Sequence, residues 1–217
     1  MTRIIVDKLG FLEESLIVIP SIISRMDKAP FIEPSEEVRI QFLALLQLCL
    51  EKDATQFLPY VSDVSQMLSV ILTDPNPEMK INAARFAEKL STLLKDKVGG
   101  HLKKSVVSLT DNLKHQHSKV RNASLNGLKY VCVAKDAEEF LSEAIPQLKM
   151  TANDRSQDVR MNVITITEYW LQNMDYHSLK TFEKDLMLIL LNGISEDQKL
   201  DISEKSQSVL ETHGRHL

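Results

Sequence analysis

The stretch Ser-Lys-Val-Arg at Ser118–Arg121 is one of five copies of a short pattern in which a polar turn leads to an apolar residue, usually followed by a basic one. The other copies are Glu-Glu-Val-Arg at 36–39, Pro-Glu-Met-Lys at 77–80, Gln-Asp-Val-Arg at 157–160 and Leu-Asp-Ile-Ser at 200–203. Successive apolar anchors are 41, 41, 39 and 43 residues apart, namely Val38, Met79, Val120, Val159 and Ile202. This period is typical of a repeat of two helices. The sequence therefore predicts a stacked array and not a single globular core.

The residues around each anchor predict a helix with one buried stripe. In the second copy, Ala83, Phe86 and Leu90 follow Met79 at positions four, seven and eleven. Side chains at these spacings lie on one face of an α-helix, so the anchor opens a helix that buries this face. Polar side chains five residues before the anchors can accept the free backbone N–H groups of that helix; they are Glu33, Asp74, His115, Asp154 and Asp197.

A second apolar stretch with nearly helical spacing precedes the later turns, at residues 57–72, 101–113, 140–150 and 182–191. The unit is therefore a helix, a turn, a second helix and a short link. Aromatic residues make up only 6% of the chain, which also favours helices over strands. We predict an all-α protein, an α-α superhelix of about five helix pairs that forms one solenoid over residues 1–217. Residues 4–23 begin without a polar cap, so we expect the chain to be part of a longer array.

The chain offers little for catalysis or cofactor binding. Cys49 and Cys132 fall in apolar helical stripes and fit neither a disulfide framework nor a metal spacing. His101, His115 and His117 are better explained as turn residues than as metal ligands. Without a phosphate-binding glycine loop or a nucleophile motif, we expect no enzyme activity, no cofactor and no small-molecule substrate. With no signal peptide and no run of roughly 20 apolar residues, we expect a cytoplasmic protein outside the membrane.

Positive charge gathers in the central third of a chain whose net charge is −4. The residues that could form a partner patch are Lys103, Lys104, Lys114, Lys119 and Tyr169. A solvated face is the simpler explanation of these lysines; the functional one is a patch that meets an acidic partner or an RNA. The net charge is negative and exposed aromatic residues are not interleaved with the lysines, so we expect protein partners and no nucleic acid.

One basic position recurs directly after the anchors, at Arg39, Lys80, Arg121 and Arg160. It falls close to the acidic turn positions of neighbouring repeats, represented by Asp74 and Asp154. We predict that these six residues form a structural ladder of ion pairs along the stack and not a binding site. Exposed ion pairs of this kind add little stability individually.

The unit length, the turn of the form Asp-x-x-x-x-Val-Arg and the helix pair resemble HEAT repeats over roughly residues 13–214. Residues 33–39, residues 72–80 and above all His-Gln-His-Ser-Lys-Val-Arg at His115–Arg121 are similar to the dynein axonemal assembly factor 5 family of HEAT-repeat proteins. The resemblance implies a cytoplasmic, non-enzymatic scaffold for the preassembly of axonemal dynein arms during cilium assembly. The partners that it implies are axonemal dynein chains, chaperones and other assembly factors.

The fifth copy departs from the pattern, because Ser203 follows its anchor in place of a basic residue and Lys205, Ser206 and Gln207 replace small or apolar ones. This puts the packing of the last pair in question. An alternative function is a general HEAT-repeat adaptor, such as a transport receptor or a phosphatase scaffold. The same array would then bind a GTPase, a cargo signal or an enzyme subunit.

Overall fold

The computed structural model describes residues 11–133, 138–195 and 199–213 of the chain. Ten α-helices lie in these ranges, and none of the residues described there is in a β-strand. The first helices of the pairs are α2 Phe11–Met26, α4 Val61–Ile71, α6 Lys103–Asn112, α8 Glu138–Thr151 and α10 Tyr176–Ser195. The second helices are α3 Glu36–Lys52, α5 Pro77–Leu94, α7 Ser118–Val131, α9 Gln157–Asn173 and α11 Leu200–His213. The predicted all-α superhelix of five helix pairs is therefore confirmed.

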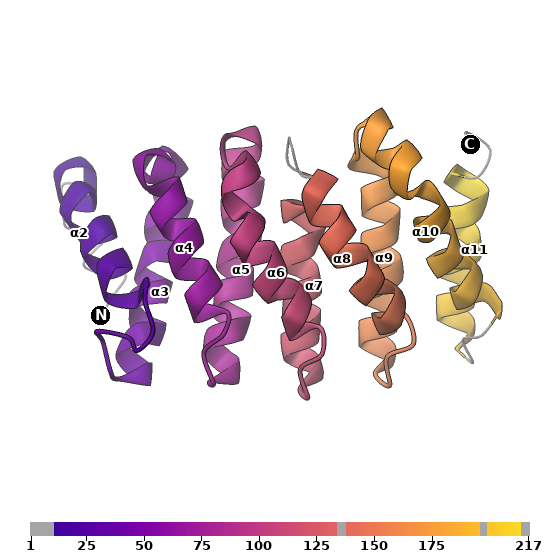
Figure 1. Ribbon diagram of the computed structural model, residues 1–217, viewed down its shortest axis with the longest axis horizontal. Helices are drawn as coiled ribbons and strands as arrows, with labels where there is room; N and C mark the ends of the chain where they lie inside the picture. Colours follow the sequence, from indigo (N-terminus) through magenta and orange to yellow (C-terminus); the bar gives the residue numbers. More distant parts are fainter. Residues whose placement is uncertain (1–10, 134–137, 196–198, 214–217) are drawn as a thin grey trace.

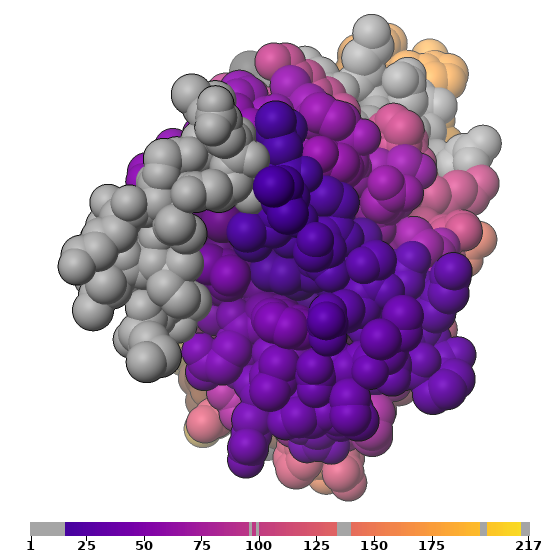
Figure 2. Space-filling view, turned by 90° about the vertical axis from the view of Figure 1, so that its left-hand side faces the viewer, coloured from indigo at the N-terminus to yellow at the C-terminus, as the bar shows by residue number. Residues whose placement is uncertain are grey.

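The helices form two parallel layers in one row (Figure 1). First helices pack on first helices, as α4 does on α6 and α6 on α8, while second helices pack on second helices from α3 to α11. Seen from the amino-terminal end, the first pair covers much of the pairs behind it (Figure 2). The turns inside the pairs lie along one long edge of the row, at the bottom of Figure 1. Each turn therefore has the turns of the neighbouring pairs beside it.

The links between pairs contain short 3₁₀ helices, η1 Ala54–Tyr60, η2 Lys95–Lys97 and η3 Gly99–Leu102. The predicted beginnings of two first helices, at residues 57 and 101, fall in these segments, and the α-helices begin a few residues later. Pro59 in η1 has no backbone N–H to donate, so the regular hydrogen bonds of α4 begin after it.

The buried stripe of each second helix faces the preceding pair. The Trp170 side chain is fully buried, and its indole Nε1 donates to the backbone oxygen of Lys129 on α7 at 3.0 Å. A Cβ atom on Gly127 would lie 3.3 Å from the backbone oxygen of Ala84 on α5. Each stripe therefore needs an earlier second helix to cover it.

The anchor of the first copy differs from the expected buried position. Val38 is 36% exposed, whereas Met79, Val120 and Val159 are fully buried. Within the described ranges α3 has no second helix before it, so the stripe that begins at Val38 lacks the neighbour that covers the other anchors. The core residues of α3 are Leu43, Leu46 and Leu50, which lie off this stripe, and Cys49 at its far end.

The last pair is packed in spite of its polar residues. The Ser206 side chain is fully buried where α11 meets the preceding helices, and Ile202 and Val209 are each 1% exposed. Lys205 places its Nζ 2.6 Å from Oε2 of Glu168 on α9. Ser206, which is buried, thus takes the position that Phe42, Ala83, Ser124 and Val163 hold in the earlier copies. Within the described part of the chain, no helix has the length and apolarity needed to span a membrane.

We predict that Gly127→Val destabilises the array by about 1–3 kcal/mol, because the added side chain meets the backbone of α5 and the Leu109 side chain in a packed interior. Thermal or denaturant unfolding followed by circular dichroism measures this. Gly100→Val is the matched control, since nothing lies within 4 Å of a Cβ atom at Gly100. Equal losses for the two variants would contradict the close packing of α5 on α7.

Candidate functional site

The turns inside the pairs share one hydrogen bond that shapes them. In the second turn, Oδ1 of Asp74 accepts from the backbone N–H of Asn76 at 2.8 Å. Oδ1 of Asp154 accepts from the N–H of Ser156 in the same way, also at 2.8 Å. The polar residue five places before the anchor thus accepts from the residue that precedes the helix, and not from the helix itself as we expected. This bond folds the turn so that the second helix can begin.

Two of the basic ladder residues join neighbouring turns through buried ion pairs. Nη2 of Arg39 lies 3.0 Å from Oδ2 of Asp74, and the two side chains are 5% and 0% exposed. Nη2 of Arg121 donates to Oδ1 of Asp154 at 2.7 Å, and the Arg121 side chain is 5% exposed. We expected exposed pairs that contribute little; burial makes the loss of one partner costly, because the other charge stays in the interior.

The same arginines also bind the carbonyl groups of their own turns. Nη1 of Arg39 donates to the backbone oxygens of Glu33 and Pro34 at 3.0 and 2.9 Å. Nη1 of Arg121 donates to those of His115 and Gln116 at 2.7 and 3.0 Å. A planar guanidinium can serve both sets of acceptors at once. Each of these two arginines therefore holds its own turn in shape and ties it to the next one.

Lys80 departs from this scheme, because the residue in the acidic position of the next turn is His115. Nζ of Lys80 donates to the backbone oxygen of Leu72 at 2.8 Å and to Oδ1 of Asn112 at 2.9 Å. Both acceptors are neutral. Burial lowers the pKa of the Lys80 ammonium, and the charge of Asp74 opposes this shift. The ladder thus has a link without a carboxylate partner between the second and third pairs.

The last ladder residue, Arg160, donates from Nη1 to the backbone oxygen of Asp154 at 2.8 Å. This repeats the contact that Arg39 and Arg121 make with their own turns. The acidic position of the following turn is Asp197, which lies outside the described residues. An ion pair between Arg160 and Asp197 therefore stays a prediction.

His115 takes over the turn-forming role of the aspartates. Its Nδ1 accepts from the backbone N–H of His117 at 3.1 Å, which requires an unprotonated Nδ1. Burial is the largest cause that lowers the pKa of the His115 imidazole, and the charges of Lys80 and Arg121 lower it further. The third turn is therefore closed by a neutral side chain where its neighbours use a carboxylate.

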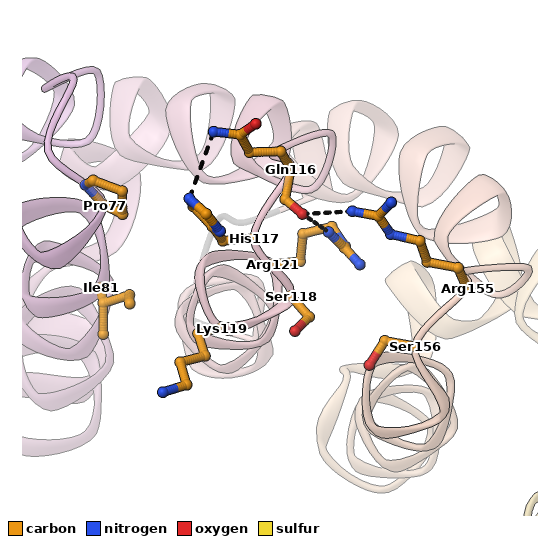
Figure 3. A pocket seen from close by; sticks show the side chains of 9 residues that line it. All are labelled: Pro77, Ile81, Gln116, His117, Ser118, Lys119, Arg121, Arg155 and Ser156. Atoms are coloured by element: carbon orange, nitrogen blue, oxygen red, sulfur yellow. Dashed lines mark hydrogen bonds between the residues drawn. The ribbon is translucent and has the colours of Figure 1, made fainter.

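An open groove of about 690 Å³ crosses the edge of the row at the second, third and fourth turns. We call it the turn groove; it is lined by Pro77 and Ile81, by residues 116–119 and Arg121, and by Arg155 and Ser156. Figure 3 shows Arg121 and Arg155 meeting at the backbone oxygen of Gln116, while Lys119 points into the space on the α5 side. The Arg155 Nη2 to Gln116 oxygen distance is 2.7 Å. Positive side chains thus stand on both sides of the beginning of α7.

The structure does not bring the five residues of the predicted partner patch together. Lys103 and Lys104 begin α6, whereas Lys114 follows its other end, about 15 Å away at 1.5 Å per residue. Lys119 belongs to the turn groove. Nζ of Lys104 donates to Oε1 of Gln66 at 2.8 Å, and Nζ of Lys114 lies 3.6 Å from Oδ1 of Asp111. The lysines are therefore split between the two ends of α6.

Tyr169 lies in a different place, on the layer of second helices. Its ring centroid is 5.1 Å from that of Tyr130 on α7, and Nζ of Lys129 is 4.6 Å from the centroid of Tyr169. Burial raises the pKa of the Tyr169 phenol. Both tyrosines line a smaller groove of about 340 Å³, which also includes Lys95 and Asn173. This cluster depends on contacts between helices about 40 residues apart in sequence.

Nothing among the described residues forms a group of three or more side chains suited to hold a metal ion. Cys49 and Cys132 are free and buried, and burial raises the pKa of both thiols. A thiol with a raised pKa is a poor nucleophile at neutral pH.

Comparison with protein families identifies a match described as "Dynein axonemal assembly factor 5-like, TPR repeats", over residues 3–217. Curated relatives named dynein axonemal assembly factor 5 are 26% identical over 186 residues in Xenopus laevis and 24% identical over 183 residues in Mus musculus. These alignments cover 85% and 84% of this chain but only 22% and 21% of the relatives. The chain thus spans about a fifth of the length of these proteins.

Solved structures with the same fold include designed armadillo repeat proteins. One of them, in complex with the peptide (KR)4, superposes with a TM-score of 0.64 at 14% identity and covers 93% of this chain and 86% of its own. The family description uses the term TPR repeats, but a spacing of 39–43 residues exceeds the 34 residues of that repeat. The helix pairs are therefore of the HEAT and armadillo kind.

We predict that Arg121→Ala lowers the free energy of unfolding by about 3–5 kcal/mol, because Asp154 is left as a charge without its buried partner. Denaturant unfolding followed by circular dichroism is the measurement. Lys114→Ala serves as the control, since its pair with Asp111 is more than 60% exposed on both sides and should contribute less than about 1 kcal/mol. An Arg121→Ala variant as stable as the control would show that the pair does not hold the turns.

We also predict that His115 makes the array less stable in mild acid. The pKa of His115 in the folded state is lowered from its ordinary value of about 6.5, so the unfolded chain binds more protons in this range. The contribution of His115 to the free energy of unfolding is therefore complete above about pH 6.5 and decreases as the pH falls toward the pKa of the folded state. Thermal midpoints at pH 7.5, 6.5 and 5.5 measure it.

The control for this pH dependence is His115→Asn, whose side-chain oxygen can accept the same backbone N–H without titrating. We expect a smaller loss of the midpoint between pH 7.5 and 5.5 in this variant than in the original chain. Parallel curves for the two proteins would contradict a neutral, turn-closing His115.

Proposed function

Since the chain belongs to the dynein axonemal assembly factor 5-like family, we propose that it is a non-enzymatic protein-binding scaffold that serves the preassembly of axonemal dynein arms in the cytoplasm. The single observation that carries this proposal is the family match over residues 3–217. The names of the Xenopus laevis and Mus musculus relatives support the same role. The two-layered row of helices is the form that such a scaffold needs.

The geometry supports binding of large partners in preference to small ones. Two layers of parallel helices give long, continuous surfaces, and arrays of this type bind proteins along them. The buried pairs Arg39–Asp74 and Arg121–Asp154 fix the turns of neighbouring pairs relative to one another. Side chains on different pairs can therefore keep a constant spacing, which lets one partner contact several pairs at once.

The partners that we propose are axonemal dynein chains, together with chaperones and other assembly factors. Dynein chains follow from the names of the family and of the relatives, and chaperones from the role in preassembly. A designed array of the same fold was solved with a bound peptide, which supports recognition of extended protein segments by such a surface. We propose no nucleic acid, membrane or small-molecule substrate as partner.

The proposal is tested by affinity capture of the tagged protein from the cytoplasm of ciliated cells, followed by mass spectrometry. We expect axonemal dynein chains to be recovered together with chaperones. An unrelated armadillo-type array of similar size with the same tag, expressed in the same cells, controls for proteins that bind any helical solenoid. Recovery of transport GTPases or phosphatase subunits without dynein chains would refute the proposal in favour of a general adaptor.

A further inference from the structure

The turn groove carries positive charge that the ion pairs of the stack leave unmatched. Lys119 is exposed, and within the described part of the chain its Nζ has no hydrogen-bond or ion-pair partner. Arg155 is exposed too and uses Nη2 for the backbone oxygen of Gln116, which is an uncharged acceptor. The charge of the third cation, Arg121, is matched by Asp154. Two positive charges therefore face the groove without a carboxylate.

The acidic side chains of this edge lie outside the lining. None of the described residues that line the groove is an aspartate or a glutamate. Glu78 and Asp158, both exposed, are the acidic residues in the first turns of α5 and α9, beside Pro77 and two residues after Ser156. Two further acidic residues, Glu36 on α3 and Asp201 on α11, lie outside the lining. Glu36 accepts a hydrogen bond from Asn76, and Asp201 accepts a hydrogen bond from Gln157. The positive region is thus confined to the middle of the edge.

The third turn explains why the positive region is confined to the middle of the edge. In the second and fourth turns Asp74 and Asp154 are the turn-forming acceptors, whereas the third turn uses the imidazole of His115. The third turn therefore lacks the carboxylate that its neighbours have, and it carries Lys119 at the same time. The groove is centred on this turn (Figure 3).

The helices that begin at the groove add to its preference for anions. His117 and Ser156 precede α7 and α9 without a side-chain cap, whereas Ser35 and Asn76 cap α3 and α5. The uncapped first turns of α7 and α9 therefore present backbone N–H groups next to Lys119 and Arg155. Carboxylate oxygens can accept hydrogen bonds from both kinds of donor.

The extent of the groove indicates a chain segment and not a single small anion. Its lining comes from the beginnings of three second helices, α5, α7 and α9. With roughly 10 Å between packed helices, the groove spans about 20 Å. An extended peptide covers this distance with about six residues. Lys119 and Arg155 stand on opposite sides of α7, so they can meet two separate carboxylates of one segment.

We propose that the turn groove binds an acidic segment of a protein partner, with Lys119 and Arg155 as the cations that recognise its carboxylates. This inference rests on the proposed function as a protein-binding scaffold and names the chemistry of one of its contacts. A protein segment fits better than a nucleic acid, because the chain has a net charge of −4 and His117 is the single ring in the described lining on which a base could stack.

The test measures binding of a fluorescent ten-residue peptide containing six glutamates to the purified chain by fluorescence anisotropy, at 50 and 200 mM salt. A peptide with glutamine in place of every glutamate is the matched probe. We expect the acidic peptide to bind at least tenfold more tightly than the glutamine peptide at 50 mM salt, and to weaken at 200 mM. The double variant Lys119→Gln, Arg155→Gln should bind the acidic peptide at least fivefold more weakly.

The matched control variant is Lys180→Gln, Lys184→Gln, which removes the same charge from exposed positions on α10, away from the turn groove. It should bind like the original chain, and the thermal midpoints of the two double variants should agree with that of the original. If both double variants bound the acidic peptide equally weakly, the loss of affinity would come from net charge alone, and the proposal would be overturned. Tighter binding of a ten-nucleotide oligouridine, lost in the groove variant only, would assign the groove to nucleic acid and also overturn it.

The outcomes separate this inference from the proposed function. If the original protein captures dynein chains from cells but does not bind the acidic peptide, the inference about the turn groove fails alone. If the peptide binds through Lys119 and Arg155 but dynein chains are not captured, the dynein role fails and the acidic site stands.

Discussion

A guanidinium shared between two successive turns is the interaction on which the regularity of the stack depends. Arg39 and Arg121 each bind carbonyl oxygens of their own turn and a carboxylate of the next. Because these groups are buried, the geometry cannot relax into solvent, and the spacing of the turns becomes fixed. Apolar stripes alone would tolerate sliding of one pair on another, since burial of apolar area is not directional.

The direction of the stripes explains why the stack must be continuous. Trp170 and Gly127 both face the preceding second helix, through an indole hydrogen bond and a close backbone approach. Within the described ranges α3 has no second helix before it, and its anchor Val38 is exposed. Stability in this architecture is therefore a sum over neighbours, and each stripe and ion pair belongs to two pairs at once.

The sequence predicts the repeat and its period well, because both arise from local spacing that recurs five times. It also places Arg39 and Arg121 near the acidic turns, since their positions relative to the anchors are constant. It misses the burial of those pairs, because residue type alone suggests that arginine and aspartate lie in solvent. Arg155 is missed too: it stands directly after Asp154 and has no counterpart in the other copies, so only the packed turns show that it reaches Gln116.

The position of His115 connects the stability of the stack with the charge of its surface. An aspartate there would match the pattern of Asp74 and Asp154 and would give Lys80 a carboxylate partner like those of Arg39 and Arg121. The same carboxylate would stand two residues from His117 in the lining of the turn groove and would oppose an acidic ligand. A neutral acceptor that keeps the turn closed resolves this conflict, because it preserves the backbone hydrogen bond to His117 and leaves Lys119 and Arg155 unmatched. The link of the ladder that lacks a carboxylate and the unmatched positive charge of the turn groove thus have one physical cause.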